Sequence, residues 1–355
     1  MRISVVVPLY NGEKYIGRAL DSIRGQTHKD IETVVVDDGS TDGGASVVTC
    51  YKGIDIKLVR KRNAGAGSAR NRGITEASSE YVAFLDADDE WDPDFLAAVL
   101  SLKEEYPKAG IFGTGYRVVC PEGPTMEITI PEARRRATFL VLDYFRRCKG
   151  GQIINSSGVM IAKETLSRLG TFQEGVAHGE DLEMWARIAL HYPIAYDGRI
   201  LFSYHQTGFD SKPRQATSPL IDPMLRLLDG EAVSETDPSL QRDLSVYRKL
   251  YLRQSLRWFL QFGDRASAIR YFDANLAWDA LWPPLKVVSS KNGWRILRAF
   301  SLVSRFRRSR LALQMRGGMA SSNGVLKRIG RKWSAEPGYP GKPPRSRIRI
   351  DGANH

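Results

Sequence analysis

The chain has 355 residues, 42% hydrophobic and 10% aromatic, which is enough for about two domains with a sizeable core and excludes disorder throughout. Its net charge of +12 is uneven: residues 286–350 hold 17 of the 52 Lys and Arg with one acid, so this segment carries +16 and the rest −4. No apolar run approaches the roughly 18 residues that span a bilayer, and residues 5–9 are too few for a signal-peptide core, so we expect a cytoplasmic protein.

Short β-branched runs alternate with helical stretches over the first 105 residues, which is typical of a parallel or mixed α/β sheet. Gly25 is placed to end the first helix, and Asp92-Pro93 indicates an N-cap and first residue of a later helix that runs to about residue 105. The pattern predicts strands at residues 3–8, 31–36, 56–59 and 81–85, and helices at residues 11–25, 42–51 and 66–77.

The alternation loosens after residue 105. Strands and loops are expected at residues 109–135 and 152–163, a helix at 180–191, a strand at 194–205, and helices after a proline-rich break at 213–219. We therefore predict an α/β domain over residues 1–212 with halves 1–105 and 106–212. A helical region over 213–333, basic from 286, and a disordered basic tail over 334–355 complete the chain.

Three cysteines, Cys50, Cys120 and Cys148, lie far apart without C-x-x-C spacing. This pattern indicates neither a disulfide framework nor a zinc site, so we expect reduced thiols.

Two acidic motifs follow predicted strands. Asp37-Asp38 comes where the second strand ends, at the edge of an α/β sheet that binds ligands, and a carboxylate there can accept a hydrogen bond from the ring N–H of uracil, thymine or guanine. The alternative is a turn, because Asp, Gly, Ser and Thr favour turns and caps. We expect one carboxylate to face a ligand and the other, Asp37, to brace the loop.

The second acidic motif is Asp86-Ala87-Asp88-Asp89, in which alternate carboxylates can point to one side. Clustered hard oxygen ligands attract Mg²⁺ or Mn²⁺, which would be shared with a substrate diphosphate. The alternative is a helix-entry loop in which Asp89 or Asp92 acts as a cap.

Residues 63–73 begin with small residues that let the backbone approach a ligand, and they supply two cations, Arg70 and Arg72. They lack the G-x-G-x-x-G spacing of a dinucleotide site, and the chain contains no phosphate-binding P-loop motif. This argues against NAD enzymes and P-loop ATPases.

Taken together, the motifs resemble those of family-2 glycosyltransferases of the GT-A fold. The matching segments are Val-Val-Val-Pro-Leu-Tyr-Asn, Val-Asp-Asp-Gly-Ser-Thr-Asp, Asn-x-Gly-x-x-x-Ala-Arg-Asn-x-Gly and Phe-Leu-Asp-Ala-Asp-Asp, followed by Gly-Glu-Asp-Leu-Glu-Met-Trp. The resemblance extends to about residue 210. It implies a Rossmann-like mixed sheet flanked by helices, and inverting transfer of a sugar from a nucleotide-diphosphate donor, most simply a UDP-sugar, with Mg²⁺ or Mn²⁺.

The resemblance also assigns the donor site. The family's nucleotide-binding positions fall on Pro8, Tyr10 and Asp38, with Tyr10 near the base. Asp86 and Asp88 take the D-x-D positions: Asp88 would ligate the metal, and Asp86 would reach the ribose, or the metal through water. For Tyr10 the alternative is a core tyrosine.

On the acceptor side, the resemblance places the catalytic base at Asp181. Inversion by direct displacement needs one base and no carboxylate nucleophile. On a helix Glu180 points about 100° away from Asp181, so the two acids have different tasks, and Glu180 is expected to brace the acceptor loop. The alternative for Asp181 is an acid that interacts with the helix dipole.

His205 ends a predicted strand near where many family members place an Arg or His that touches the metal or the diphosphate. The local pattern Ser-Tyr-His-Gln-Thr-Gly departs from the commoner tyrosine-arginine form. Two roles for His205 therefore stay open: a metal ligand and an ordinary surface histidine. His178 and His191 have no such context.

The sequence thus favours a glycosyltransferase that acts on a hydroxyl acceptor, such as a lipid-linked glycan, in envelope polysaccharide, glycolipid or glycan assembly. A metal-dependent nucleotidyltransferase is one alternative. A nucleic-acid-binding protein is another, but the basic tail has no recognised motif, so no nucleic-acid partner is expected. Aromatic and aliphatic residues interleave with arginines over residues 286–333, which predicts peripheral contact with an anionic membrane surface. The alternative for this segment is a solvated or nucleic-acid-attracting tail.

Overall fold

The structure is a computed structural model that describes residues 1–121, 123–134, 138–176, 179–206, 222–230, 237–262 and 265–274. Its strands are β1 (Ile3–Leu9), β2 (Ile31–Asp37), β3 (Ile56–Arg60), β4 (Tyr81–Phe84), β5 (Glu90–Trp91), β6 (Ile111–Val119), β7 (Met126–Ile128), β8 (Thr138–Val141), β9 (Val159–Ala162) and β10 (Ile194–His205). Its α-helices are α1 (Ile16–Arg24), α2 (Gly44–Cys50), α3 (Ala66–Glu76), α4 (Phe95–Glu105), α5 (Tyr144–Arg147), α6 (Lys163–Leu169), α7 (Glu180–Ala189), α8 (Pro223–Leu228), α10 (Pro238–Phe262) and α11 (Arg265–Ala274). Short 3₁₀ helices are η1 (Pro131–Arg134), η2 (Cys148–Gly150) and η3 (Ser156–Gly158).

The strands form one mixed sheet in the order β3-β2-β1-β4-β9-β6-β10-β5, with β7 beside β6 and β8 beside β10. The first four strands of this order run parallel to one another, and β9 pairs antiparallel with both β4 and β6. The carboxyl ends of β1, β2 and β4 therefore share one edge, where ligands bind in open α/β sheets.

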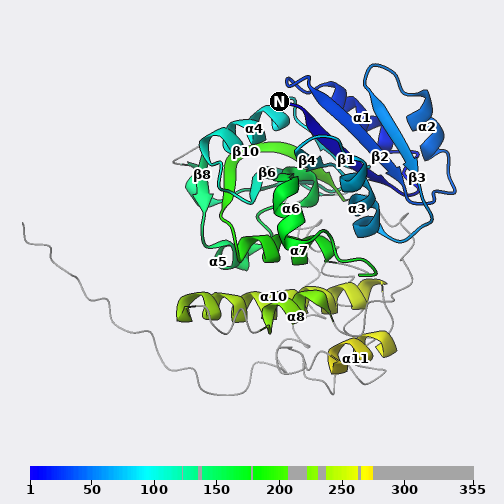
Figure 1. Ribbon diagram of the computed structural model, residues 1–355. Coiled ribbons are helices and arrows are strands. Elements are labelled where there is room, and N and C mark those ends of the chain that lie inside the picture. Colours follow the sequence, from blue (N-terminus) through cyan, green and yellow to red (C-terminus); the bar gives the residue numbers. More distant parts are fainter. Residues whose placement is uncertain are drawn as a thin grey trace, which may run out of the picture. The chain divides into compact units, whose positions relative to one another are not determined.

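Helices cover both faces of the sheet (Figure 1). Apolar side chains of α1, α2 and α4 pack on one face, and those of α3, α6 and α7 pack on the other. The β-branched runs of β1 and β2 are buried on both faces, as expected for central parallel strands. The predicted mixed α/β sheet flanked by helices is confirmed.

The region after residue 221 is helical where it is described, as predicted. In Figure 1, α10 runs beneath α5, and α8 and α11 lie near it. Buried Leu244, Tyr247 and Tyr251 of α10 belong to the core that α7 also lines. The predicted break at 213–219, the basic region 286–333 and the tail 334–355 lie outside the described residues. The division into domains at residue 212 stays a prediction.

Two predicted helix starts are wrong. The first helix begins at Ile16 because residues 12–15 form a turn in which the Tyr15 and Ile16 amides both donate to the Gly12 carbonyl over 2.9 Å. Asp92-Pro93 does not begin α4, whose N-cap is Asp94. Instead Asp92 follows the short strand β5, its amide donates to Leu201 O, and its carboxylate pairs with Arg117 at 2.7 Å.

None of the described helices combines the length and apolar character that crossing a bilayer requires. All three cysteines are free thiols, as expected.

Candidate active site

The loops after β1 and β2 form one wall of the sheet edge. Tyr10 follows β1 and is 42% exposed, which excludes the alternative of a core tyrosine, while Pro8 is partly buried within β1. Asn11 has a left-handed φ of 50°, which Asn tolerates, and its Oδ1 accepts from the Thr41 amide at 2.8 Å. Tyr10 is thus held next to the Asp37-Asp38 loop with its ring open to solvent.

Both carboxylates of the Asp37-Asp38 pair are buried. Asp37 Oδ1 accepts from the Ser40 amide at 2.8 Å, so its expected loop-bracing role is confirmed. Asp38 Oδ1 accepts from Lys61 Nζ at 2.8 Å and from the Ala64 amide at 3.0 Å, and Oδ2 accepts from the Gly65 amide at 2.8 Å. Asp38 therefore ties β2 to the segment that precedes α3, and its contact with a nucleobase stays a prediction.

Arg70 is the centre of the buried charge network. This residue of α3 is 4% exposed; its Nη2 donates to Asp86 Oδ1 at 2.7 Å and its Nη1 donates to Glu180 Oε1 at 3.1 Å. Burial lowers the pKa of Arg70, but the carboxylates of Asp86, Glu180 and Asp181 outweigh it and raise the pKa above its usual value. The guanidinium therefore stays charged and links the end of β4 to the start of α7.

Asp181 lies in the first turn of α7, beside this network. Its Oδ1 accepts from the Leu182 amide at 2.8 Å, and its Oδ2 accepts from Ser156 Oγ at 3.2 Å. Burial and the charge of Glu180 raise the pKa of Asp181 to about 6, against the lowering effect of Arg70. A carboxylate with this pKa is ionised at neutral pH and is basic enough to take a proton from a hydroxyl group during a reaction.

Asp89 does not act as a helix cap, which was one alternative for the second acidic motif. It is fully buried, and its Oδ2 accepts from Ser157 Oγ at 2.5 Å while its Oδ1 accepts from the His205 amide at 2.9 Å. Burial, with the charges of Asp86 and Asp88, raises the pKa of Asp89 well above its usual value. Asp89 thus ties the carboxylate loop to η3 and to the end of β10.

The bond from the His205 amide to Asp89 holds the end of β10 against the residue that follows Asp88. His205 Nε2 lies 3.0 Å from Glu90 Oε1, so His205 is not an isolated surface histidine. Within the described residues no group of three or more His, Cys, Asp or Glu side chains is arranged to hold a metal ion. The donor set of Asp86, Asp88 and His205 nevertheless suits Mg²⁺ or Mn²⁺ in kind, because such ions are held by one or two carboxylates together with substrate phosphates.

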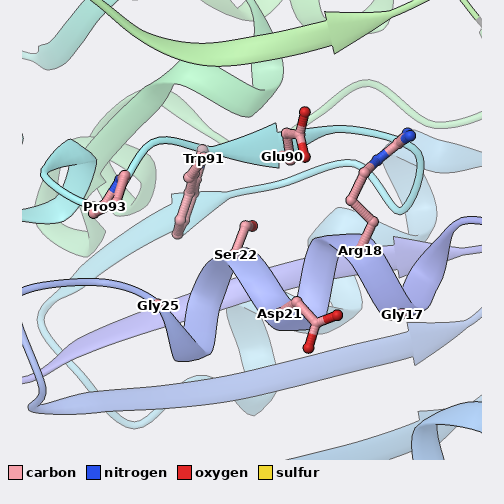
Figure 2. A pocket seen from close by; sticks show the side chains of 8 residues that line it. All are labelled: Gly17, Arg18, Asp21, Ser22, Gly25, Glu90, Trp91 and Pro93. Atoms are coloured by element: carbon pink, nitrogen blue, oxygen red, sulfur yellow. The ribbon is translucent and has the colours of Figure 1, made fainter.

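A cavity of about 510 Å³ lies between α1 and the segment around β5 (Figure 2). Figure 2 shows Arg18 extending from α1 toward the strand that carries Glu90. Arg18 Nη2 also donates to the carbonyl of Asp88, so the cavity adjoins the carboxylate loop. Neither Tyr10 nor Asp181 lines it.

Three contributors to the site were not predicted in these roles: Ser157, Lys61 and the junction made by Arg70. Ser157 and Lys61 carry no readable signal in the sequence. Arg70 carries one, because Arg70 and Arg72 are two positions apart on a helix and point in different directions, so at most one of them can face the protein. Arg72 is the exposed one, with 47% of its side chain accessible. His178 lies outside the described residues.

Comparison with known proteins supports one family. Residues 4–167 match the family model described as Glycosyl transferase family 2. The chain is 33% identical over 188 residues to the putative teichuronic acid biosynthesis glycosyltransferase TuaG of Bacillus subtilis, covering 52% of this chain and 70% of that protein. It is also 30% identical over 201 residues to an uncharacterized glycosyltransferase of Rickettsia felis, covering 56% of this chain and 33% of that protein. The chain spans about a third of the length of several curated relatives that it matches.

Among solved structures, the fold is similar to that of S. aureus TarS, residues 1–349, in complex with UDP-GlcNAc. The TM-score is 0.60 at 19% identity, over 89% of this chain and 92% of the TarS chain. The UDP complex of the same protein gives a TM-score of 0.58 at 19% identity, over 91% and 93% of the two chains.

Proposed function

The chain belongs to glycosyl transferase family 2, and on this premise we propose that it transfers a sugar from a nucleotide-diphosphate donor to a hydroxyl group of an acceptor. The observation that carries the proposal is Asp181, a carboxylate whose pKa is raised to about 6 beside the Asp86–Arg70–Glu180 network. Such a transfer requires a base that takes the proton of the acceptor hydroxyl, and Asp181 is our candidate for that base.

The reaction we propose is a single displacement with inversion. The acceptor oxygen attacks the anomeric carbon as the bond from that carbon to the diphosphate oxygen breaks. Asp181 takes the proton of the attacking hydroxyl, and the electron pair of the broken bond leaves on the nucleoside diphosphate. No covalent sugar–enzyme intermediate is needed, because Asp181 acts as a base and not as a nucleophile.

The departing diphosphate gains negative charge that has to be stabilised. We propose that Asp88 and His205 hold a divalent cation, with Asp86 reaching the ribose or a metal-bound water. When bound, Mg²⁺ or Mn²⁺ supplies positive charge to the leaving group. Asp86 Oδ1 pairs with Arg70, which supports a role for Asp86 at the ribose or at a metal-bound water.

For the donor we propose a UDP-sugar bound at Pro8, Tyr10 and Asp38. TarS, which has a similar fold, was solved with UDP-GlcNAc, which supports a nucleotide sugar as the donor here. The exposed ring of Tyr10 offers a surface on which a base can stack. For Asp38 the proposal requires that Oδ2, which accepts one hydrogen bond from the Gly65 amide, accept a second from the ring N–H of the base.

For the acceptor we propose a glycan hydroxyl in envelope polysaccharide assembly, because one relative is a putative teichuronic acid biosynthesis glycosyltransferase. A lipid-linked acceptor would place the reaction at a membrane surface. Residues 286–333, which interleave arginines with apolar side chains, are our proposed contact with anionic lipid.

The deciding experiment is a screen of nucleotide sugars that measures release of nucleoside diphosphate, with and without candidate glycan acceptors. Acceptor-dependent release that Asp181→Asn abolishes supports the proposal. Release of pyrophosphate would identify a nucleotidyltransferase instead, and an absence of either product across all donors would reject the proposed activity.

A further inference from the structure

The helices of the C-terminal region meet at one buried carboxylate, Asp222, which is 4% exposed. Its Oδ1 caps α8 by accepting from the Met224 amide at 2.8 Å and the Leu225 amide at 3.4 Å. Its Oδ2 accepts from Tyr251 Oη of α10 at 2.9 Å and also from Tyr271 Oη of α11. One side chain therefore fixes the two tyrosines relative to the start of α8.

Tyr251 also contacts Gly179, which directly precedes Glu180 and Asp181 of the candidate active site. A Cβ placed on Gly179 would lie 3.1 Å from Tyr251 Oη and 3.2 Å from Tyr251 Cε2, so the phenol packs directly on the glycine backbone. Burial and the charge of Asp222 raise the pKa of Tyr251 well above its usual value, so the phenol stays protonated and donates to Asp222. Tyr271 donates to the same carboxylate, but it is not among the nearest atoms to Gly179.

Gly179 is the N-cap of α7, with a left-handed φ of 77°, and it immediately precedes Glu180 and Asp181. Its side-chain-free backbone lets the phenol approach and lets the chain turn into α7. The position of this residue sets where the first turn of α7 begins, and thus where the Asp181 carboxylate lies.

The pKa of Asp181 depends on that position because several groups face it from different elements. Glu180 on α7, Arg70 on α3 and Asp86 after β4 act on its charge directly. The phenols whose pKa values also depend on that charge are those of Tyr116 on β6, Tyr204 on β10 and Tyr247 on α10, of which Tyr204 is partly buried. A shift of the first turn of α7 changes all of these distances together.

We propose that Tyr251 is a positioning residue for the catalytic base: held by Asp222, its phenol packs on Gly179 and fixes the first turn of α7, so that Asp181 faces the acceptor hydroxyl. This inference rests on the proposed function and goes beyond it. It gives the C-terminal helices a task in the reaction in addition to packing. Misplacement of a reacting group by about 1 Å can lower a rate by about 10²-fold, so a loosened first turn of α7 affects turnover before it affects folding.

The test compares Tyr251→Phe with Tyr271→Phe in the full-length protein. Each variant keeps its ring and removes one hydrogen bond to Asp222. Tyr271→Phe also removes a bond of 3.5 Å to Ser255 Oγ, so it should lose at least as much thermal stability as Tyr251→Phe. Only Tyr251→Phe also removes the oxygen that packs on Gly179. We expect Tyr251→Phe to lower kcat by about 10-fold with the donor KM unchanged, and Tyr271→Phe to leave kcat near the wild-type value.

A second experiment measures the pKa of Asp181 directly and does not require turnover. The carboxyl carbon of Asp181 is titrated by ¹³C NMR and assigned by its loss in Asp181→Asn. We expect the pKa to move from about 6 toward the ordinary aspartate value in Tyr251→Phe, because a looser first turn admits water, and to stay in place in Tyr271→Phe.

Gly179→Ala tests the same contact from the other side. Its added Cβ meets the Tyr251 hydroxyl, so the loss of kcat caused by Gly179→Ala should be smaller in the Tyr251→Phe background and unchanged in the Tyr271→Phe background. Two outcomes would overturn the positioning role. One is that Tyr251→Phe and Tyr271→Phe change kcat and the pKa of Asp181 equally. The other is that Tyr251→Phe changes neither quantity. A wild-type protein that releases no nucleoside diphosphate would reject the proposed function alone, because the NMR titration still decides the positioning role.

Discussion

Arg70 and Glu180 form an ion pair, with 3.1 Å between Arg70 Nη1 and Glu180 Oε1, although 110 positions separate them in the chain. Arg70 belongs to α3, and Glu180 is the first residue of α7. Since Arg70 Nη2 also binds Asp86, the guanidinium holds the predicted D-x-D loop against the helix that carries Asp181. These two helices are therefore joined at the candidate active site by charge as well as by the apolar core.

Replacing Arg70 with Met should destabilise the fold by about 3–5 kcal/mol, because Asp86 and Glu180 would keep their charges without the buried partner. The matched control is Arg72→Met, two residues away, whose exposed side chain pairs with Glu76 and should change the free energy of unfolding by no more than about 0.5 kcal/mol. Chemical denaturation measures both. Equal losses for the two variants would show that the buried network contributes nothing specific.

Asp181→Asn should fold and bind donor normally but transfer sugar at least about 10²-fold more slowly, which is the lower end of what a positioned base contributes. The amide keeps the shape of the side chain and removes its basicity. The measurement compares single-turnover rates of the wild type and of Asp181→Asn at saturating donor and acceptor. Near-normal rates would move the base to another residue, with Glu180 the next to test.

The rate should fall as the pH drops through about 6, because the transfer requires ionised Asp181 and its pKa is raised to about 6. Glu180→Gln removes the charge that helps raise this pKa, so its acidic limb should lie at lower pH than that of the wild type. The measurement is the pH profile of kcat/KM for acceptor. A limb that does not move in Glu180→Gln would contradict the assignment of the limb to Asp181.

The sequence predicts the strands well because their signal is local. The β-branched runs of β1 and β2 and the full length of β10 were located to within one residue, since hydrophobic residues bounded by turn residues mark a buried strand. The short strand β5 was missed, and with it the start of α4. It has two residues and exists because β10 pairs with it, which is a tertiary effect.

The candidate site was predictable as a list of positions but not as a network. Motif order placed Asp38, Asp86 and Asp181 at the sheet edge, but not the hydrogen-bond partners of each. Lys61 bonds Asp38 from 23 positions away in the chain, and Ser157 bonds Asp89 from 68 positions away. Both contacts form only because loops distant in the sequence meet in the folded protein. No periodicity encodes such contacts. Of these residues, Arg70 alone has a signal in the sequence, which is its spacing of two positions from Arg72.

Asp88→Ala should abolish transfer even with Mn²⁺ in excess, and a chelator should abolish transfer by the wild type until Mn²⁺ or Mg²⁺ is restored. The reason is that clustered carboxylates after β4 suit a cation shared with the donor diphosphate. Binding of Mn²⁺ to the protein in the presence of UDP, followed by electron paramagnetic resonance, checks the ligand role without turnover. Full activity in chelator would assign stabilisation of the leaving group to Arg or Lys side chains.

Residues 286–333 should hold the protein at an anionic membrane surface. They lie outside the described residues. Trp294, Phe300 and Phe306 can enter the lipid interface while the neighbouring arginines meet lipid phosphates. Each basic residue near such a surface contributes about 1 kcal/mol at best, so several suffice for reversible binding that weakens with salt. Co-sedimentation with anionic and neutral vesicles at low and high salt measures it.

The full-length protein should sediment with anionic vesicles at low salt, and a form that ends at Leu285 should not. Replacing Arg305, Arg307 and Arg308 with Gln in the full-length chain should weaken binding while leaving the apolar residues in place, which separates attraction to lipid phosphates from insertion of aromatic rings. If the shortened form binds equally well, or the full-length form binds neutral and anionic vesicles alike, the segment is not the membrane contact. Binding to RNA in place of vesicles would instead support the nucleic-acid alternative, because the same cations attract any polyphosphate.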